Sequence, residues 1–176
     1  KILRHRRSQD SNSICLRLSG VIALLKSELI ELKLVVPTED QTKLLYQQLC
    51  TRTYSISHVA LPSYESHKEF VANHPYRAWF IIQQNYIVLG NIYIQYDNSI
   101  GLTCYDEITE TQIRTILDLV TYKLRPLDPV PSVRVGKFFL NVAASNIHLQ
   151  EKLKKLGLKE SQRSFIFETE GQRTSI

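Results

Sequence analysis

The chain has 176 residues, of which 43% are hydrophobic and 22% are charged, so its composition is that of an ordinary globular protein. This length predicts one domain that folds around its own core without disulfide bonds or a structural metal. The composition excludes a disordered, collagen-like or disulfide-scaffold protein. Apolar runs such as 21–25 are far shorter than the roughly 20 residues of a membrane-spanning helix, so no membrane span is expected.

The formal net charge of +5 is concentrated at the start of the chain. Residues 1–28 hold 6 of the 22 basic residues and 2 of the 17 acidic ones, so the remainder is close to neutral. A nucleic-acid-binding domain should carry a basic face interleaved with aromatic residues, and nucleic acid is therefore not expected as a partner. The basic cluster in 1–7 could contact phosphates or anionic lipid, but a solvated extension is the favoured interpretation.

The cysteines favour a reducing compartment. There are three of them, an odd number without CxxC spacing, at Cys15, Cys50 and Cys104. This pattern is typical of reduced thiols, and it predicts a cytoplasmic protein without a zinc site.

The predicted elements begin after the basic segment, in which only 14–29 has the spacing of a helix. Alternation and β-branched residues predict a strand at 31–36. A Thr-x-x-Gln capping pattern from Thr38 predicts a helix to about residue 51, and Ser63 after a proline predicts another over 63–73. Short turns at Asn85 and at 97–98 then separate three strands, which we expect at 76–84, 88–96 and 99–105.

The second half continues with alternating helices and strands. Helical spacing predicts a helix over 109–123, and three prolines mark 125–131 as a connector. A strand is expected at 137–142, a helix at 145–156 ending at Gly157, and a last strand at 163–168.

This order predicts an α/β (α+β) fold, with a central mixed, mostly antiparallel sheet and helices on both faces. We expect a basic N-terminal extension at 1–28, a domain at 29–169 and a loose C-terminal tail at 170–176.

Several motifs resemble the GNAT superfamily of acyl-CoA N-acyltransferases. The segments similar to the family's central meander are 74–80, 89–93 and 98–101, and those similar to its closing part are 141–146, Leu153, 157–158 and 165–167. The similarity covers about residues 32–168. It implies a GNAT-like fold and the transfer of an acetyl or other acyl group from acyl-CoA to a small-molecule or peptide amine.

The resemblance also implies where the cofactor lies. In the family, the strand that matches 99–105 parts from the strand that matches 137–142, and the pantetheine arm occupies the gap. The residues implied in cofactor binding are Leu102, Thr103, Cys104, Tyr105, Asn141 and Asn146. The acceptor would enter beside His74, Tyr76 and Arg77.

The loop that holds the pyrophosphate in the family departs from its glycine-rich pattern. Residues 106–114 contain no glycine, and Glu110, Gln112 and Arg114 stand where glycines usually stand. A carboxylate beside a phosphate costs about 4 kcal/mol at about 4 Å and an effective dielectric of about 20. Thr109 with Gln112 is also a capping-box pattern, which predicts a capped helix rather than an anion cradle.

The catalytic acid of the family is missing as well, because Leu153 stands where many members carry a tyrosine. Family enzymes deprotonate the amine with a carboxylate or an ordered water, so the candidate bases are Asp97, Asp106, Glu107 and, on the acceptor side, His74. We interpret Cys104 as a buried structural cysteine rather than an acyl acceptor. We interpret His58, His67 and His74 as surface or capping residues, although histidine is the natural base near neutral pH.

Two hypotheses follow. The chain is an acyl-CoA-dependent N-acyltransferase, or it is a GNAT-like domain that has lost cofactor binding and serves as a binding module for a protein partner. A fold does not determine chemistry, so the loop and the gap between the strands must discriminate them.

Overall fold

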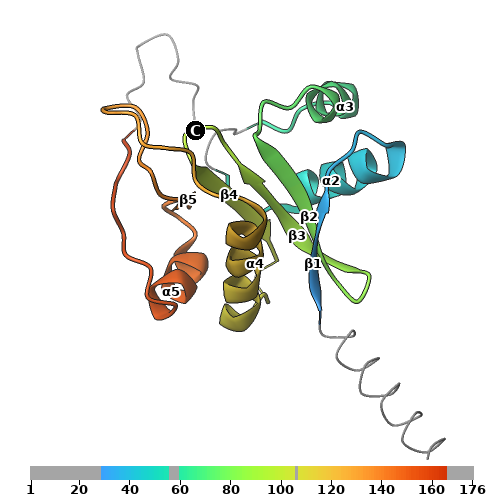
Figure 1. Cartoon of the computed structure of the whole chain (residues 1–176). Coiled ribbons are helices and arrows are strands. Elements are labelled where there is room, and N and C mark those ends of the chain that lie inside the picture. The colour runs from blue at the N-terminus through green and yellow to red at the C-terminus, as the bar shows by residue number, and fades with distance from the viewer. Residues whose placement is uncertain (1–28, 56–59, 106, 166–176) are drawn as a thin grey trace, which may run out of the picture.

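A single five-stranded sheet forms the centre of the protein, as seen in the computed structural model, which describes residues 29–55, 60–105 and 107–165 (Figure 1). The elements in chain order are β1 (Ile30–Leu34), α2 (Glu39–Thr51), α3 (Tyr64–Ala72), β2 (Ala78–Gln84), β3 (Ile87–Ile94), β4 (Ser99–Cys104), α4 (Glu110–Lys123), β5 (Phe139–Asn141) and α5 (Ile147–Lys155). The predicted basic extension at 1–28, the predicted helix at 14–29 apart from its last residue, and the predicted tail at 170–176 lie outside the described residues.

The strands lie side by side in chain order, β1-β2-β3-β4-β5. The first four are antiparallel, and β5 pairs with β4 in parallel. Helices α2 and α3 cover one face of the sheet, whereas α4 and α5 cover the other (Figure 1). The predicted fold class, a mixed and mostly antiparallel sheet with helices on both faces, is therefore confirmed.

Local sequence signals explain where the helices begin. Thr38, Ser63 and Thr109 are N-caps whose hydroxyl oxygens accept backbone N–H groups of the first turn of α2, α3 and α4. At α4 the capping box is complete, because Gln112 Oε1 also accepts the Thr109 N–H at 2.8 Å. The predicted capping boxes differ in one detail, since Gln41 reaches back to the N–H of Val36 rather than to that of Thr38.

The two hairpin turns lie where the asparagines predicted them. Asn85 and Tyr86 have φ of 52° and 66°, which is the left-handed region that a tight two-residue hairpin requires. Asn98 also has a positive φ of 72°, and it is fully buried. Its amide donates to the carbonyls of Leu127 and Val135 and accepts the N–H of Leu127. Asn98 thereby binds the proline-rich connector to the start of β4 and helps to place β5.

The two faces of the sheet carry different cores. The face under α4 and α5 buries a large aliphatic cluster that includes Ile92, Ile94, Ile113, Ile116 and Val120. At about 25 cal/mol per Å² of apolar surface removed from water, such a cluster supplies much of the folding free energy. The face under α2 and α3 has a smaller cluster, Val35, Leu45, Val71, Trp79 and Ile81, beside polar side chains.

The last predicted strand is wrong for the residues that the structure describes. Residues 163–165 have no strand structure, and 166–168 lie outside the described part. Arg163 instead pairs with Glu160 three residues earlier, with 2.6 Å between Nε and Oε1, and Phe165 is exposed. Alternation alone predicted this strand, but a strand forms only where a partner offers hydrogen bonds.

Candidate functional site

Strands β4 and β5 pair over three residues and then part. Their register joins Ser99 to Phe139 and ends at Gly101 with Asn141. Strand β4 continues through Leu102–Cys104, where its register partners lie on β3. Sheet edges carry backbone groups that can pair with an added extended chain. Among the described residues, this parting leaves a stretch of β4 beside which an extended ligand could lie.

A cavity of about 360 Å³ lies over this region, on the α2–α3 face of the sheet. Its floor is a cross-strand row in which Trp79, Tyr93, Gly101 and Asn141 are successive partners on β2, β3, β4 and β5. Its opposite wall comes from the end of α2 and from α3, with Leu45, Leu49, Arg52, Tyr54, Ser66, His67 and Phe70. With Leu149 of α5 also in the lining, the cavity depends on four strands and three helices at once.

Gly101 makes room for the floor of the cavity. A Cβ added to this residue would collide with the ring of Tyr93, its cross-strand partner. The ring of Tyr93 therefore lies flat over the glycine and stacks on Tyr76, with ring centroids 4.2 Å apart. A larger residue at this position would have to displace the aromatic floor.

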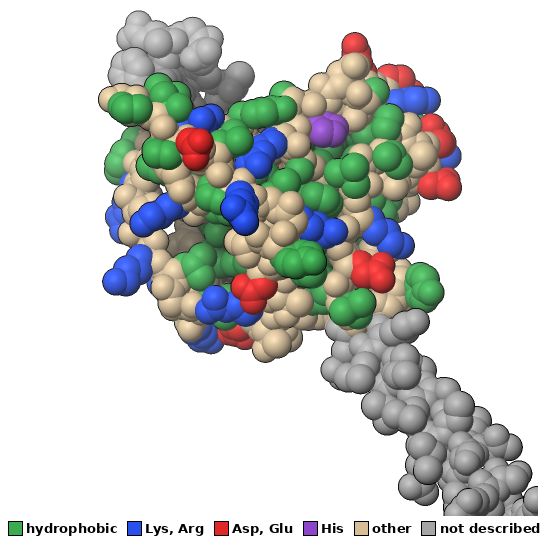
Figure 2. All heavy atoms as spheres, in the orientation of Figure 1, with side chains coloured by type: hydrophobic (Ala, Val, Ile, Leu, Met, Phe, Trp, Pro, Cys, Tyr) green, Lys and Arg blue, Asp and Glu red, His purple; other side chains and the backbone are tan. Residues whose placement is uncertain are grey.

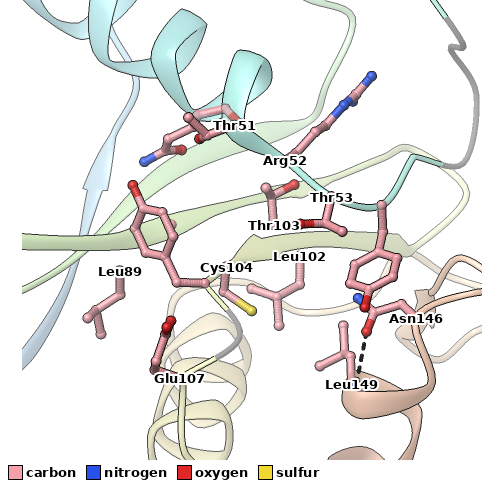
Figure 3. Close-up of a pocket in the computed structure, with 14 residues that line it drawn as sticks. Thr51, Arg52, Thr53, Leu89, Leu102, Thr103, Cys104, Glu107, Asn146 and Leu149 are labelled. Atoms are coloured by element: carbon pink, nitrogen blue, oxygen red, sulfur yellow. Dashed lines mark hydrogen bonds between the residues drawn. The ribbon is translucent and has the colours of Figure 1, made fainter.

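A second cavity of about 220 Å³ adjoins the first and shares Arg52, Tyr54, Leu102, Thr103, Asn146 and Leu149 with it. Figure 3 shows Thr103 pointing from β4 towards the end of α2, whereas Leu102 and Cys104 point the opposite way. This alternation is the normal consequence of strand geometry. Below β4 in this view lie Glu107 and the start of α5 with Asn146, whose Oδ1 accepts the Leu149 N–H at 3.0 Å.

A buried hydrogen-bonded chain ties α2 to the floor. Trp79 Nε1 donates to Asn91 Oδ1 at 3.1 Å, and Asn91 Nδ2 donates to Gln48 Oε1 at 2.6 Å. All three side chains are buried. Buried polar groups cost free energy unless they are paired, so this chain orients Trp79 and holds the end of α2 above the sheet.

Burial keeps the tyrosines of the cavity neutral. It raises the pKa of Tyr76 to about 12, with the neighbouring Tyr93 as a second cause, and it raises the pKa of Tyr93 as well. The positive charge of Arg52, which lines the same cavity, offsets part of both increases in pKa. At neutral pH these phenols are hydrogen-bond donors and acceptors without charge.

The structure brings all six predicted cofactor-binding residues to the two cavities. Leu102, Thr103, Asn141 and Asn146 line the larger one, and Cys104 and Tyr105 line the smaller one. Cys104 also packs against the aliphatic core, which agrees with a structural role. Their placement beside the parted strands matches the geometry that the resemblance implied, while their role in binding stays a prediction.

Only one of the three residues predicted to lie beside the acceptor lines a cavity. Tyr76 lines the larger cavity, whereas His74 stacks on it from outside, with ring centroids 5.6 Å apart. Burial lowers the pKa of His74. Arg77 points away, because its Nη2 donates to the carbonyl of Arg125 in the connector at 2.9 Å.

The predicted candidate bases also lie in different places. Glu107 lines the smaller cavity. Asp97 accepts the Ser99 N–H at 2.8 Å in the turn before β4, which is a local structural role at the far end of the strand. Asp106 lies outside the described residues.

The start of α4 is a capped helix, as the capping-box pattern predicted. Glu110 pairs with Lys155, with 3.3 Å between Oε1 and Nζ, and its pKa is lowered by its own backbone N–H first and by Lys155 second. Gln112 Nε2 donates to Gln84, and Arg114 donates to the carbonyl of Leu156. The three residues at glycine positions of the family therefore have structural partners here.

Sequence reasoning missed two side chains of the cavity, Arg52 and Asn91, and misinterpreted a third, His67. Asn91 could have been found as a polar residue inside an apolar strand, and His67 as the residue four before Val71 on the buried face of α3. His67 is 6% exposed, so its interpretation as a surface residue is wrong. Leu153 is buried in the aliphatic core and lines neither cavity, so nothing there replaces the tyrosine of the family.

Charge is spread over the surface rather than concentrated near the cavities. Figure 2 shows Lys and Arg side chains scattered among hydrophobic and polar ones on the face in view, with acidic groups near α2 and α3. There Glu39 pairs with Lys43 and Lys68. Within the described residues, three or more His, Cys, Asp or Glu side chains nowhere gather as a metal site would need, and the helices are too short and polar to cross a membrane.

Comparison with known proteins finds likeness in structure alone. No family model matches the chain, and no curated protein sequence matches it either. An integron cassette protein from the mobile metagenome of V. cholerae has a TM-score of 0.52 at 11% identity, over 81% of this chain and 94% of that one.

Two further solved structures cover 81% of this chain. One is a possible acetyltransferase from Clostridium difficile 630, with 14% identity, 98% of its own length covered and a TM-score of 0.48. The other is AAC(6')-Iy in complex with a CoA-containing bisubstrate analogue, with 13% identity, 99% of its own length covered and a TM-score of 0.47. At these identities the likeness concerns the fold. The sheet order and the parallel β4–β5 pair agree with the fold that the sequence resemblance implied, and the likeness to the cassette protein shows that the two proteins share a fold.

Proposed function

We propose that the chain is an acyl-CoA-dependent N-acyltransferase whose cofactor arm lies along β4. One observation carries the proposal. Strands β4 and β5 part after Gly101 and Asn141, and both cavities lie at that place. A pantetheine arm contains amide groups and an extended chain, so it can add to such an edge as a strand does.

The described residues fit the pantetheine part of the cofactor. Backbone groups of Leu102 and Thr103 border the larger cavity, and Asn141 ends the paired segment beside them. Asn146 uses its Oδ1 to cap α5, so its Nδ2 is the group that it can offer to a ligand carbonyl. When bound, acyl-CoA supplies an activated thioester.

The described residues at the start of α4 do not form the glycine-rich pyrophosphate site that the family uses. The Gln112 N–H at the start of α4 is already bonded by Thr109, and the carboxylate of Glu110 stands in the first turn. An anion there would meet the negative charge of Glu110 and a smaller number of available N–H groups. We therefore assign no residue to the pyrophosphate.

Calorimetric titration of the full chain with acetyl-CoA and with free CoA tests the proposal. We expect binding with a dissociation constant in the micromolar range, and Asn141→Ala should weaken it about tenfold, which corresponds to about 1.4 kcal/mol. Gln47→Ala is the control, because this exposed amide on α2 lines neither cavity. The proposal would be contradicted if the full chain showed no binding at cofactor concentrations up to millimolar. It would also be contradicted if Asn141→Ala bound the cofactor with unchanged affinity.

The capped start of α4 favours a second candidate, a GNAT-like binding module without cofactor. All three residues at the glycine positions of the family have structural partners. This candidate predicts that neither CoA nor acetyl-CoA binds, while the aromatic cavity still accepts a ligand. The same titration therefore separates the two functions.

A further inference from the structure

We propose that the larger cavity binds an amine that also carries a carboxylate and a planar apolar body, as an aromatic amino acid does, with Arg52 binding the carboxylate. This inference rests on the proposed function only in taking that ligand as the acyl acceptor. It names a substrate class from three features of the cavity, namely its charge, its walls and a buried imidazole whose Nε2 has no hydrogen-bond partner among the described residues.

Arg52 supplies the charge. It follows the last turn of α2, is half-buried and lines the cavity, and among the described residues no carboxylate lies within ion-pair distance of it. Figure 3 shows its side chain directed away from Cys104 and Glu107. Arg52 lines the larger cavity together with Tyr76 and Tyr93.

The remaining described lining residues leave that charge uncompensated. They include neither Asp nor Glu in the larger cavity. A partly desolvated guanidinium is stabilised by an anion, and its planar fork of donors matches the two oxygens of a carboxylate. The electrostatics therefore favour a ligand with a negative group at this end of the cavity.

The walls are aromatic. Phe70, Tyr76, Trp79 and Tyr93 line the cavity and contact one another edge-on or stacked, with ring centroids 4.2 to 6.0 Å apart. Planar rings favour edge-on or offset contacts with such walls. A body of this kind displaces water from apolar surface, which a small polar amine would not do.

His67 supplies the group for the amine. Its side chain is 6% exposed and borders the cavity, and its Nε2 has no hydrogen-bond partner among the described residues. A hydrogen bond to the backbone of Thr42 involves the imidazole, and burial is the main cause that lowers its pKa. When Thr42 accepts from Nδ1, the neutral ring leaves Nε2 as a proton acceptor, and a rotation of the ring opens this buried atom to a ligand amine.

These features describe one ligand. A carboxylate for Arg52, an amine for His67 and a flat apolar body for the tyrosines and Trp79 are the three parts of an aromatic amino acid. Clefts with mostly apolar walls and a few convergent polar groups are the usual form of small-molecule sites.

Trp79 makes the test simple, because it is the chain's only tryptophan and it lines the cavity. Its fluorescence is followed while the full chain, without CoA, is titrated with L-phenylalanine. Phenethylamine, which lacks the carboxylate, and 3-phenylpropionate, which lacks the amine, are the matched ligands. We expect saturable binding of L-phenylalanine, and at least tenfold weaker binding of phenethylamine and of 3-phenylpropionate.

Variants locate the two polar contacts. Arg52→Gln should reduce the affinity for L-phenylalanine about tenfold and leave that for phenethylamine unchanged, with Arg52→Lys intermediate. His67→Gln should weaken the two amines and spare 3-phenylpropionate. Arg125→Gln, an exposed arginine in the connector, is the control. Circular dichroism of each variant confirms that a lost signal is not lost folding.

The outcomes separate this inference from the proposed function. Binding of L-phenylalanine without binding of CoA supports the inference and contradicts the acyltransferase. Binding of CoA with equal affinity for the three aromatic ligands, or with none, overturns the inference and leaves the acyltransferase standing. If Arg52→Gln weakens CoA rather than L-phenylalanine, Arg52 serves the cofactor through the smaller cavity, and the inference is also overturned.

Discussion

The two faces of the sheet differ in the side chains that they bury. Under α4 and α5, the face is aliphatic, and Ile92, Ile94 and Ile113 are completely buried in one continuous cluster. Under α2 and α3, the same strands present Trp79, Asn91 and Tyr93, and two cavities lie above or beside them. Strand alternation makes this possible, since neighbouring residues of β3 face opposite sides.

The difference teaches which face carries stability and which carries the candidate site. Apolar burial without cavities stabilises a fold most for its size, whereas a cavity and buried polar groups give up some of that stability. A protein can therefore keep a site on one face when the other face supplies a full core. Mutations on the two faces should separate stability from binding.

The largest expected effect is on the aliphatic face. Ile116→Ala removes a fully buried side chain of α4 and should lower the free energy of unfolding by about 2–5 kcal/mol. Binding of L-phenylalanine to the folded variant should be unchanged, because Ile116 lines neither cavity. Urea unfolding measures the first quantity and Trp79 fluorescence the second. Asp118→Ala, exposed on the same helix, should change stability by less than about 0.5 kcal/mol.

On the polar face, Asn91→Ala should affect stability and binding together. It leaves Trp79 Nε1 and Gln48 Oε1 buried without their partner, which costs about 1–3 kcal/mol, and it releases the indole from its orientation. A double-mutant cycle with Gln48→Ala, measured by urea unfolding, should give a positive coupling energy. Additive effects would show that the chain from Trp79 to Gln48 is not a unit.

The start of α4 offers a smaller test. Thr109→Ala removes the capping hydroxyl and should lower stability by about 1 kcal/mol, whereas the exposed Thr111→Ala should not. If this turn is a capped helix and not an anion cradle, the affinity for CoA should be the same in both variants. A selective loss of CoA binding in Thr109→Ala would instead indicate that the start of α4 binds the pyrophosphate.

The smallest effect is a dependence on pH. Burial lowers the pKa of His67 below its usual 6.5, so the unfolded chain binds a proton first as the pH falls. The contribution of neutral His67 is therefore present above about pH 6.5 and is lost as the pH falls through the lowered pKa. His67→Gln should flatten this part of the profile of unfolding free energy against pH. His74→Gln is the matched comparison, since the pKa of His74 is lowered too.

Local signals predicted much of the fold and part of the site. Thr38, Ser63 and Thr109 marked helix starts correctly, because a cap needs only the residues of one turn. Asn85 marked a hairpin for the same reason. The strand at 163–168 failed over its described residues because pairing depends on a partner distant in sequence.

The cavity side chains show the same limit. His67, Asn91 and Arg52 come from α3, β3 and the end of α2, and their nearness exists only once the sheet and helices have packed. Spacing within one element could indicate the burial of His67, but not that its ring would face an aromatic cavity.

The sequence by itself determined the element order as far as α5, the mostly antiparallel sheet, the capped start of α4 and the absence of a glycine-rich loop there, because these depend on contacts within a few residues. Only the tertiary structure decided that β5 leaves β4 after Asn141, that Gly101 lies beneath Tyr93, and that Arg52 lines the aromatic cavity without a described acidic partner. Strand pairing, ring packing and ion pairing join residues tens of positions apart, and their free energies are settled when the whole chain folds.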